Sequence, residues 1–421
     1  MIGLIDCNNF FVSCEKVFNP SLHDKPVIVL SNNDGCVVSM SNEAKLLGIK
    51  RGVSVGQIQS LIDDYNIQVF SSNFKLYGDM SARVMTVLMS IVPNIEIYSI
   101  DEAFIDFTGI PTHDLEKIGM DIVKTIRRCT GIPTSLGIAK TKTLAKIASK
   151  NAKENVDYKG VFIINEENYN DVLEKILIQN VWGIGKKLSE KLNRIGILNA
   201  KAFIKNPYES YSDLLNVQGI KIWKELKGIP SIELDSDEVE KKQISSSRTF
   251  SEPLVSLTEL SYFFSLFAER IYRKLKKQNC SAISVTIYIY QNLKNDGGWS
   301  NVNSSYYKFE EPICDLVSLT STVLKMVETI FREGVEYKKG GIIIPEIIDS
   351  QYVQKNLFYS HQQRDKRRLL MESIAHLNQN CQTKDMVRVA SNITQQSSIK
   401  SDYLSRLYTT HFDELITIKC N

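Results

Sequence analysis

Three carboxylates in the first quarter of the chain could do chemistry together. Asp6 closes an apolar run that begins at Ile2, and Asp101 and Glu102 stand in a polar stretch between two apolar runs. If these segments end side by side in a sheet, the three side chains could hold two Mg²⁺ ions about 4 Å apart. Mg²⁺ takes few carboxylates and completes its shell with phosphate oxygens, so such a site suits nucleotide chemistry. Spacing alone equally allows the ordinary alternative, in which acids at strand ends are solvated turn residues.

The elements that must position these carboxylates are short strands and helices that alternate along the first 160 residues. Residues 2–7 form an apolar run typical of a buried strand, and 95–107 read as a hairpin with arms at 96–98 and 104–107 and a polar tip at 99–102. The pattern also predicts strands at 25–30, 36–40 and 134–138, and helices at 42–47 and 114–129. This mixture favours an α+β fold for the N-terminal part.

A lysine-rich helix follows the predicted strand at 134–138. Thr141 is placed to cap it, and the helical pattern continues to about residue 152. Lys146, Lys150 and Lys153 stand at i, i+4 and i+7 and therefore share one face. We expect Lys142, Lys146 and Lys150 to be solvated, and Lys153 at the helix end to be the candidate for binding phosphate.

A second candidate for binding phosphate is the turn at residues 181–188. Gly183, Gly185, Lys186 and Lys187 form a hydrophobic-Gly-x-Gly-Lys pattern between helical segments, as in a helix-hairpin-helix turn. Its glycines allow close backbone approach, and its amides and lysines could hold a DNA phosphate without reading sequence. The alternative is a plain turn between helices.

The charge of the chain is segregated. The 421 residues carry a net charge of only +3, which excludes a uniformly basic coat. Residues 1–110 hold 7 Lys and Arg against 12 Asp and Glu, whereas 181–231 hold 9 against 4 and 241–345 hold 14 against 10. The segment 233–240 has five acids and no base, which is typical of an extended linker. This distribution suits a protein that gathers carboxylates at one site and holds a polyanion elsewhere.

Length and composition exclude several other classes. The chain is long enough for several domains, and 43% apolar and 24% charged residues are typical of a folded protein. No apolar run approaches the roughly 18 residues of a membrane span. The eight cysteines form no C-x-x-C pair and no Cys/His cluster, so we expect reduced, buried thiols in a cytoplasmic protein. Near the end, Gln354, Leu357 and Phe358 fit a short peptide that inserts two apolar side chains into a partner's pocket.

Together these residues resemble the Y-family translesion DNA polymerases, and most closely the UmuC branch, which supplies the catalytic subunit of bacterial DNA polymerase V. Residues 6–15 resemble the first catalytic motif of that family, and 99–103 match its Ser-Ile-Asp-Glu signature. Residues 30–38 followed by 42–45 resemble the UmuC branch. The segment 246–250 resembles the opening of the family's extra DNA-binding domain, and 403–410 resembles a UmuC-type C-terminal tail.

The resemblance implies a role for each matching residue. It assigns two Mg²⁺ ions to Asp6, Asp101 and Glu102 with help from the backbone of Cys7, and it makes Phe11 the steric gate against ribonucleotides. The implied triphosphate contacts are Asn9, Phe10, Asn42, Lys45 and Lys153. Asn42 and Lys45 stand where many family members carry Tyr and Arg, so they lack the bidentate fork of Arg. The implied DNA contacts are Gly183, Gly185, Lys186, Lys187 and Arg248, and Gln354, Leu357 and Phe358 would bind the sliding clamp.

The implied fold class is an α+β multidomain right-hand polymerase with a ferredoxin-like palm, small fingers, a helical thumb and an α/β little finger. We expect the palm at 1–9 and 74–160, the fingers at 10–73 and the thumb at 161–232. A linker at 233–242, the little finger at 243–345 and a partner-binding tail at 346–421 would follow. Small fingers imply an open site that tolerates damaged templates.

The implied function is template-directed, error-prone DNA synthesis opposite and past damaged bases, in an SOS-type response to DNA damage. The implied partners are primer-template DNA, dNTPs, a sliding clamp, a processed UmuD-type dimer and a RecA filament. The expected location is the cytoplasm, in association with the nucleoid. Two alternatives remain open, a non-catalytic DNA-binding or regulatory subunit and a nucleotidyl cyclase on a similar palm.

Overall fold

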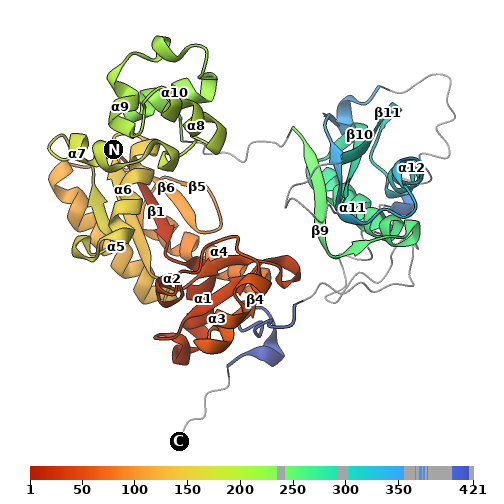
Figure 1. Ribbon diagram of the computed structural model, residues 1–421, viewed down its shortest axis with the longest axis horizontal. Helices are drawn as coiled ribbons and strands as arrows, with labels where there is room; N and C mark the ends of the chain where they lie inside the picture. The colour runs from red at the N-terminus through yellow and green to blue at the C-terminus, as the bar shows by residue number, and fades with distance from the viewer. Residues whose placement is uncertain are drawn as a thin grey trace, which may run out of the picture. The chain divides into compact units, whose positions relative to one another are not determined.

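The computed structural model describes residues 1–234, 242–291, 302–354, several positions between 366 and 377, and 401–416. These residues form two compact units (Figure 1). The first unit contains Met1–Glu238 and Ser401–Asn421, and the second contains Val239–Lys400. Most of the predicted acidic linker lies outside the described residues.

The centre of the first unit is a five-stranded sheet of mixed direction. Its strands are ordered β5-β6-β1-β7-β8. They span Ile95–Ile97 (β5), Glu102–Asp106 (β6), Ile2–Cys7 (β1), Thr134–Ala139 (β7) and Val161–Ile163 (β8). The predicted strand at 2–7 is therefore the middle strand, antiparallel to both neighbours. The hairpin differs from the prediction, because Glu102 belongs to β6 rather than to the polar tip.

Alternation along β1 and β6 assigns each residue to one face of this sheet. Ile5 and Ile105 face the core formed with α4 (Phe74–Ile91) and α5 (Leu115–Thr130). Leu4 and Phe104 face the opposite core, which includes α6 (Lys142–Glu154). Because side chains alternate along a strand, the residues two positions away from Leu4 and Phe104 also point towards α6.

The helix α6 lies unusually close to the sheet at Gly137 in β7. A Cβ atom at this position would collide with the backbone of Ala148 and Ser149 in α6, so only glycine permits this approach. Thr141 caps the helix as predicted, because its Oγ1 accepts a hydrogen bond from Leu144 N at 3.4 Å. The close contact fixes the height of the α6 lysines above the edge of the sheet.

A smaller sheet forms beside the first one. Its strands are ordered β3-β2-β4, with β3 at Val37–Met40, β2 at Val27–Leu30 and β4 at Gln68–Ser71. The surrounding helices are α1 (Phe10–Phe18), α2 (Asn42–Leu46) and α3 (Gln59–Asp64). Residues 401–416 return from the far end of the chain to β4, where Ser71 N donates to Tyr403 O at 3.0 Å (Figure 1).

A helical segment completes the first unit. It contains α7 (Tyr169–Lys175), α8 (Lys186–Arg194), α9 (Ala200–Lys205) and α10 (Val217–Leu226). Its apolar side chains, such as Leu192 and Phe203, share one core with Leu144 and Ala148 of α6. The helical segment is therefore anchored to the helix that carries the lysines.

The second unit is a five-stranded antiparallel sheet covered by two helices. The strand order is β11-β10-β12-β9, and β13 (Ile347–Asp349) pairs with β10. The strands are β9 (Ile244–Leu254), β10 (Cys280–Gln291), β11 (Val302–Ile313) and β12 (Tyr337–Ile344), and the helices are α11 (Leu257–Lys277) and α12 (Leu316–Ile330). Met371, beyond the predicted little finger, is buried against Tyr272 and Leu316 of this unit.

The six cysteines in the described ranges are free thiols, in agreement with the absence of a disulfide framework. Cys7, Cys14 and Cys280 are buried as expected, whereas Cys129 is exposed near the end of α5, where its side chain lies on the solvent side of the helix. Within the described ranges, no helix is both long enough and apolar enough to cross a membrane.

Candidate active site

The carboxylates of Asp6 and Glu102 lie opposite each other across two paired strands. Asp6 of β1 and Glu102 of β6 are direct partners in the antiparallel register, and both point to the α6 side. Cys7 N donates to Asp101 O at 2.8 Å, which fixes the hairpin turn at the end of β1. Ser99 Oγ donates to Asp101 Oδ1 at 2.6 Å. Like charges placed directly opposite destabilise a sheet, so this edge needs positive charge nearby.

Two lysines of α6 supply that charge. Lys153 Nζ contacts Asp6 Oδ1 at 2.6 Å, and Lys146 Nζ contacts Glu102 Oε2 at 3.0 Å. Lys146 also lies over the rings of Tyr98 and Trp182, 4.4 and 5.2 Å from their centroids. Each carboxylate is thus paired with one ammonium group from the helix above it.

The predicted solvent exposure of Lys142 and Lys146 is wrong. Lys142 is only 3% exposed, and its ammonium group contacts Glu96 at 2.5 Å and donates to Glu233 O at 2.6 Å. Both lysines are covered because α6 packs tightly on the sheet and the helical segment closes over its other side. The i, i+7 spacing of Lys146 and Lys153 was the signal that both reach the same edge.

Burial makes the charged form of these acids costly. It raises the pKa of Asp6 and of Glu102 above their ordinary values, although the neighbouring Lys153 and Lys146 act in the opposite direction. Burial also raises the pKa of the Cys7 thiol, so this sulfur stays protonated. Carboxylates held ionised against a burial cost are typical of sites that receive cations or protons.

The carboxylate edge opens into a pocket of about 500 Å³. The pocket collects residues from the sheet, from α1, from α6 and from the β3–α2 region. Its lining includes Asp6, Cys7, Asn9, Phe10, Phe11, Lys45, Arg51, Ser99, Asp101, Glu102 and Lys153. Nine of the residues predicted from the sequence therefore meet in one cavity. A neighbouring pocket of about 290 Å³ lies on the α6 side and includes Lys146 and Trp182.

The start of α1 forms one wall of this pocket. Asn9 precedes the helix in a left-handed conformation, with φ of 48°, and turns the chain so that the helix begins at Phe10. The first amides of a helix have no intrahelical acceptor and carry a partial positive charge. Phe10 and Phe11 both line the pocket, and Phe10 is otherwise buried. The Phe11 ring stacks on Tyr77 with ring centroids 4.5 Å apart and an interplanar angle of 13°.

Asn42 and Lys45 contact the start of α1 through hydrogen bonds with the side chain of Asn9. Lys45 Nζ donates to Asn9 Oδ1 at 2.7 Å and to Asn42 Oδ1 at 3.2 Å, and Asn9 Nδ2 donates to Asn42 Oδ1 at 3.1 Å. Burial lowers the pKa of Lys45. Arg51, which was not predicted from the sequence, also lines the pocket and donates from Nε to Val38 O at 2.7 Å. The only signal for Arg51 in the sequence was its position, six residues after Lys45, which stands where many family members carry an arginine.

The predicted DNA contacts lie in both units. Gly183 and Gly185 are exposed in the turn before α8, and Lys186 and Lys187 are exposed in its first turn. Gly183 adopts a φ of 83° that glycine permits. Arg248 belongs to β9 of the second unit, with its guanidinium 5.8 Å from the centroid of the Phe263 ring. Of the predicted clamp peptide, the structure describes only Gln354, which is exposed. Leu357 and Phe358 lie outside the described residues.

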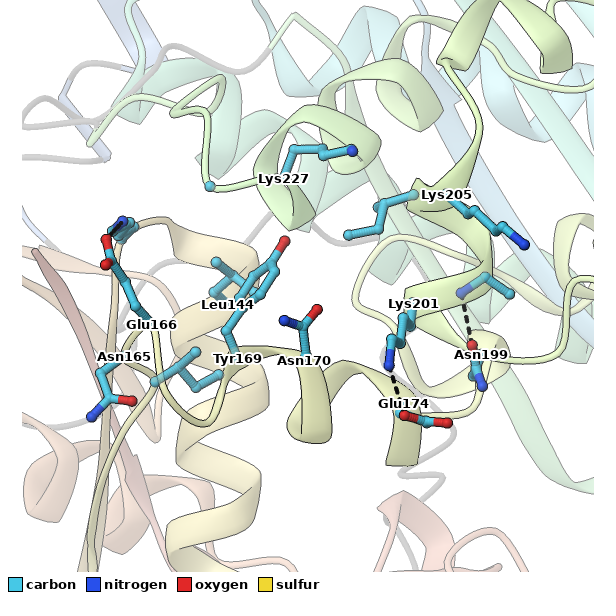
Figure 2. A pocket seen from close by; sticks show the side chains of 15 residues that line it. Leu144, Asn165, Glu166, Tyr169, Asn170, Glu174, Asn199, Lys201, Lys205 and Lys227 are labelled. Atoms are coloured by element: carbon cyan, nitrogen blue, oxygen red, sulfur yellow. Dashed lines mark hydrogen bonds and ion pairs between the residues drawn. The ribbon is translucent and has the colours of Figure 1, made fainter.

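A larger pocket, of about 810 Å³, lies between α6, α7 and α9 (Figure 2). Its two acids each pair with a lysine of the lining, Glu166 with Lys140 at 3.1 Å and Glu174 with Lys201 at 2.8 Å. We place the candidate active site at the pocket of about 500 Å³, because the burial-perturbed carboxylates of Asp6 and Glu102 line it, whereas Glu166 and Glu174 of the larger pocket are exposed. In the described part of the chain, no three His, Cys, Asp or Glu side chains have the geometry to hold a metal ion by themselves.

Comparison with known proteins gives a consistent result. The model of the impB/mucB/samB family matches residues 5–150, and the model of its C-terminal domain matches residues 241–357. The chain is 35% identical to Protein UmuC of Salmonella typhimurium strain LT2 over the full length of both chains. It is 26% identical to DNA polymerase IV of Bacillus velezensis over 94% of this chain and 93% of the relative.

Solved structures show the same fold. A chimera of the Y-family DNA polymerases Dbh and Dpo4 matches with a TM-score of 0.69 and 20% identity, over 83% of this chain and 99% of the chimera. An insertion ternary complex of Dbh DNA polymerase matches over the same shares with a TM-score of 0.52. The predicted fold class, an α+β right-hand polymerase, is confirmed.

The chain belongs to the impB/mucB/samB family of Y-family DNA polymerases, in its UmuC branch. The family predicted from the motifs is thus confirmed, and so is the enzyme class, a DNA-directed DNA polymerase.

Proposed function

We propose that the carboxylate edge catalyses template-directed nucleotidyl transfer, in DNA synthesis that proceeds opposite and past damaged bases. The observation that supports this most strongly is the meeting of nine predicted site residues in the pocket of about 500 Å³. Carboxylates from β1 and β6, an aromatic gate from α1 and lysines from α2 and α6 all line this pocket. A nucleotidyl cyclase would need no helical segment with a Gly-x-Gly-Lys turn and no basic second unit.

The donor chemistry of this edge fits Mg²⁺. Asp6, Asp101 and Glu102 offer hard carboxylate oxygens, and Asp6 and Glu102 are already held beside positive charge at 2.6 and 3.0 Å. Because these side chains do not form a complete cage, substrate phosphate oxygens and water would complete the coordination, as Mg²⁺ prefers. Asp6, Asp101 and Glu102 would hold two such ions, which would lower the pKa of the primer hydroxyl and offset the negative charge of the leaving pyrophosphate.

The residues around the carboxylates would bind and orient the nucleotide. The amides of Phe10 and Phe11 at the start of α1 are suited to hold phosphate oxygens. Lys153 would exchange its contact with Asp6 for one with the triphosphate, since the pocket includes both side chains. We assign Lys45 and Arg51 to the same phosphates, so that Arg51 supplies the planar fork that Lys45 lacks.

The ring of Phe11 would select the sugar. It stands in the pocket and is backed by the parallel ring of Tyr77, so it cannot retreat from a bound nucleotide. A ribose 2′-hydroxyl would meet this ring, whereas a deoxyribose would not. Phe11→Ala should therefore raise ribonucleotide incorporation, and unchanged sugar selectivity would remove the gate role.

DNA and protein partners would bind away from the pocket. The exposed turn with Lys186 and Lys187, together with Arg248 of the second unit, would contact the DNA backbone. We further propose a sliding clamp as partner of Gln354, Leu357 and Phe358, and a processed UmuD-type dimer and a RecA filament as activating partners.

The decisive experiment is primer extension across an abasic site, with and without clamp and activating partners. Asp101→Ala should abolish extension while leaving the affinity for primer-template DNA within about twofold, because Asp101 lies at the carboxylate edge. Asp106→Asn, at the other end of β6, is the matched control and should extend normally. Normal extension by Asp101→Ala would refute the assignment of the site.

A further inference from the structure

The C-terminal segment 401–416 is hydrogen-bonded to the base of the nucleotide pocket. Ser405 Oγ donates to Glu15 Oε1 at 3.0 Å, and Tyr77 OH donates to the same oxygen at 2.6 Å. Glu15 is only 1% exposed and belongs to α1, the helix that begins at the pocket. A residue near the end of the chain thus shares a buried carboxylate with the tyrosine that backs Phe11.

A second connection runs through Asn73. Its Nδ2 donates to Ser405 Oγ at 3.0 Å and to the carbonyl oxygens of Ser405 and Arg406 at 3.2 Å each. Its Oδ1 accepts from Leu76 N at 3.2 Å and so caps α4, the helix that carries Tyr77. The same amide therefore fixes the start of α4 and holds the C-terminal segment.

Residues before and after Ser405 also bind segment 401–416 to the rest of the first unit. Tyr403 N donates to Ser71 Oγ at 3.0 Å, and Asp402 N donates to Asp34 Oδ2 at 2.9 Å. Tyr408 stacks on Phe18, with centroids 4.9 Å apart and an interplanar angle of 7°. The segment is therefore held by the small sheet, by α1 and by α4 together.

We propose that segment 401–416 is a specificity-determining part of the nucleotide site, with Ser405, Glu15 and Tyr77 as positioning residues for the Phe11 gate. The inference rests on the gate role given to Phe11 above. Its basis is the continuous path from Ser405 through Glu15 and the Tyr77 hydroxyl to the Tyr77 ring, on which Phe11 stacks. A hydroxyl that donates to a buried carboxylate fixes that carboxylate in one place, and here the carboxylate in turn fixes the phenol.

Loss of the Ser405 hydroxyl leaves the buried Glu15 carboxylate with one donor fewer and removes one of the three acceptors of Asn73 Nδ2, whose bonds to the two carbonyl oxygens remain. The Tyr77 phenol then loses its fixed anchor, and the ring behind Phe11 gains freedom to move. Hydrogen bonds to a carboxylate are among the stronger ones, and part of the loss should reach the gate. Discrimination between dNTP and rNTP should therefore fall about tenfold.

The test measures kcat/KM for a dNTP and for the matching rNTP, on undamaged primer-template, with the same activating partners for every variant. Ser405→Ala and Tyr77→Phe should lower the ratio of the two values, chiefly by raising rNTP incorporation. Ser405→Thr keeps the hydroxyl and should restore the ratio. Asp413→Ala, in the same segment but with a side chain that is 91% exposed, should leave it unchanged. Thermal melting checks that each variant is folded.

A double-mutant cycle separates this inference from the gate role itself. If Phe11→Ala alone leaves discrimination unchanged, the gate assignment fails. If Phe11→Ala lowers discrimination and Ser405→Ala changes it no further in that background, the segment acts through the gate, as proposed. An equal effect of Ser405→Ala in both backgrounds, or an equal loss of dNTP and rNTP incorporation, would overturn the proposal.

Discussion

Replacing Asp6 by Asn should stabilise the first unit while it abolishes polymerase activity. Burial raises the pKa of Asp6, so the folded chain binds this proton more tightly than the unfolded chain. Ionisation of Asp6 therefore costs stability, and this cost is absent below the ordinary pKa of the carboxyl group and grows as the pH rises through the raised pKa of Asp6. Asn removes the buried charge, relieves the repulsion with Glu102 and keeps an oxygen that can accept from Lys153.

The expected gain in stability of Asp6→Asn is the difference between two opposed contributions. The substitution gives up the Lys153 ion pair at 2.6 Å and recovers the burial cost, which is the larger effect on the pKa of Asp6. Substitutions that relieve a strained functional site commonly add about 0.5–2 kcal/mol. For a unit of this size, about 1 kcal/mol corresponds to a rise of roughly 2–4 °C in Tm. The gain should shrink as the pH falls towards the ordinary pKa of the carboxyl group.

Thermal melting of the full chain, followed by tryptophan fluorescence, measures this gain, because Trp182 and Trp223 both lie in the first unit. Asp106→Asn is the matched control with the opposite sign. A hydrogen bond from Thr108 lowers the pKa of Asp106, so its ionised form stabilises the fold and Asn should lower Tm slightly. A lower Tm for Asp6→Asn at pH 7 would show that the ion pair outweighs burial and would refute the reasoning.

Addition of Mg²⁺ provides a second test of the same substitution. A ligand at 100 times its Kd stabilises a folded protein by about 2.7 kcal/mol. Mg²⁺ should therefore raise the Tm of the wild-type chain, and the rise should be largely lost in Asp6→Asn. An equal rise in both proteins would place the bound Mg²⁺ elsewhere.

Three further predictions concern the elements around the site. Lys146→Met leaves the half-buried Glu102 without its cation. The free energy of unfolding, measured in urea, should fall by about 1–3 kcal/mol, and tryptophan fluorescence should change. An unchanged free energy of unfolding would show that the ion pair contributes nothing. Gly137→Ala forces a methyl group into the backbone of α6 and should cost more than about 3 kcal/mol, or leave the chain insoluble, whereas normal expression and Tm would contradict the close contact. Changing Lys186 and Lys187 to Ala should weaken DNA binding for all sequences and reduce the slope of log K against log salt by about 1–2; an unchanged slope would remove both lysines from the DNA contacts.

The sequence was sufficient to predict that Asp6, Asp101 and Glu102 stand at strand ends, because the signals for strands are local. Apolar runs end at Asp6 and flank residues 99–102, although spacing alone left solvated turn residues as the alternative. The start of α6 at Thr141 was predicted for the same reason, since a cap and a helical repeat lie within a few residues. Only the position of Glu102, inside β6 rather than at the tip, required the observed register.

The contacts that cover α6 could not be predicted from the sequence. The burial of Lys142 and Lys146 depends on a helical segment that begins some thirty residues later, so the helix alone looked solvated. Glu15 lies within α1 and has no local feature that distinguishes it from a solvated acid. Its partner Ser405 is 390 positions away, and a single hydroxyl at that distance leaves no pattern in one sequence.

The place of segment 401–416 on the small sheet has a consequence for synthesis of the chain. A chain emerges from the ribosome N-terminus first, and its domains generally fold in that order. Strand β4 then lies at a sheet edge, and the Glu15 carboxylate lacks the Ser405 donor, until residue 405 has been made. Open sheet edges are where chains associate wrongly. A chain that stalls in synthesis or is cut before residue 401 would therefore expose β4. Such a chain would be open to degradation before it synthesises DNA.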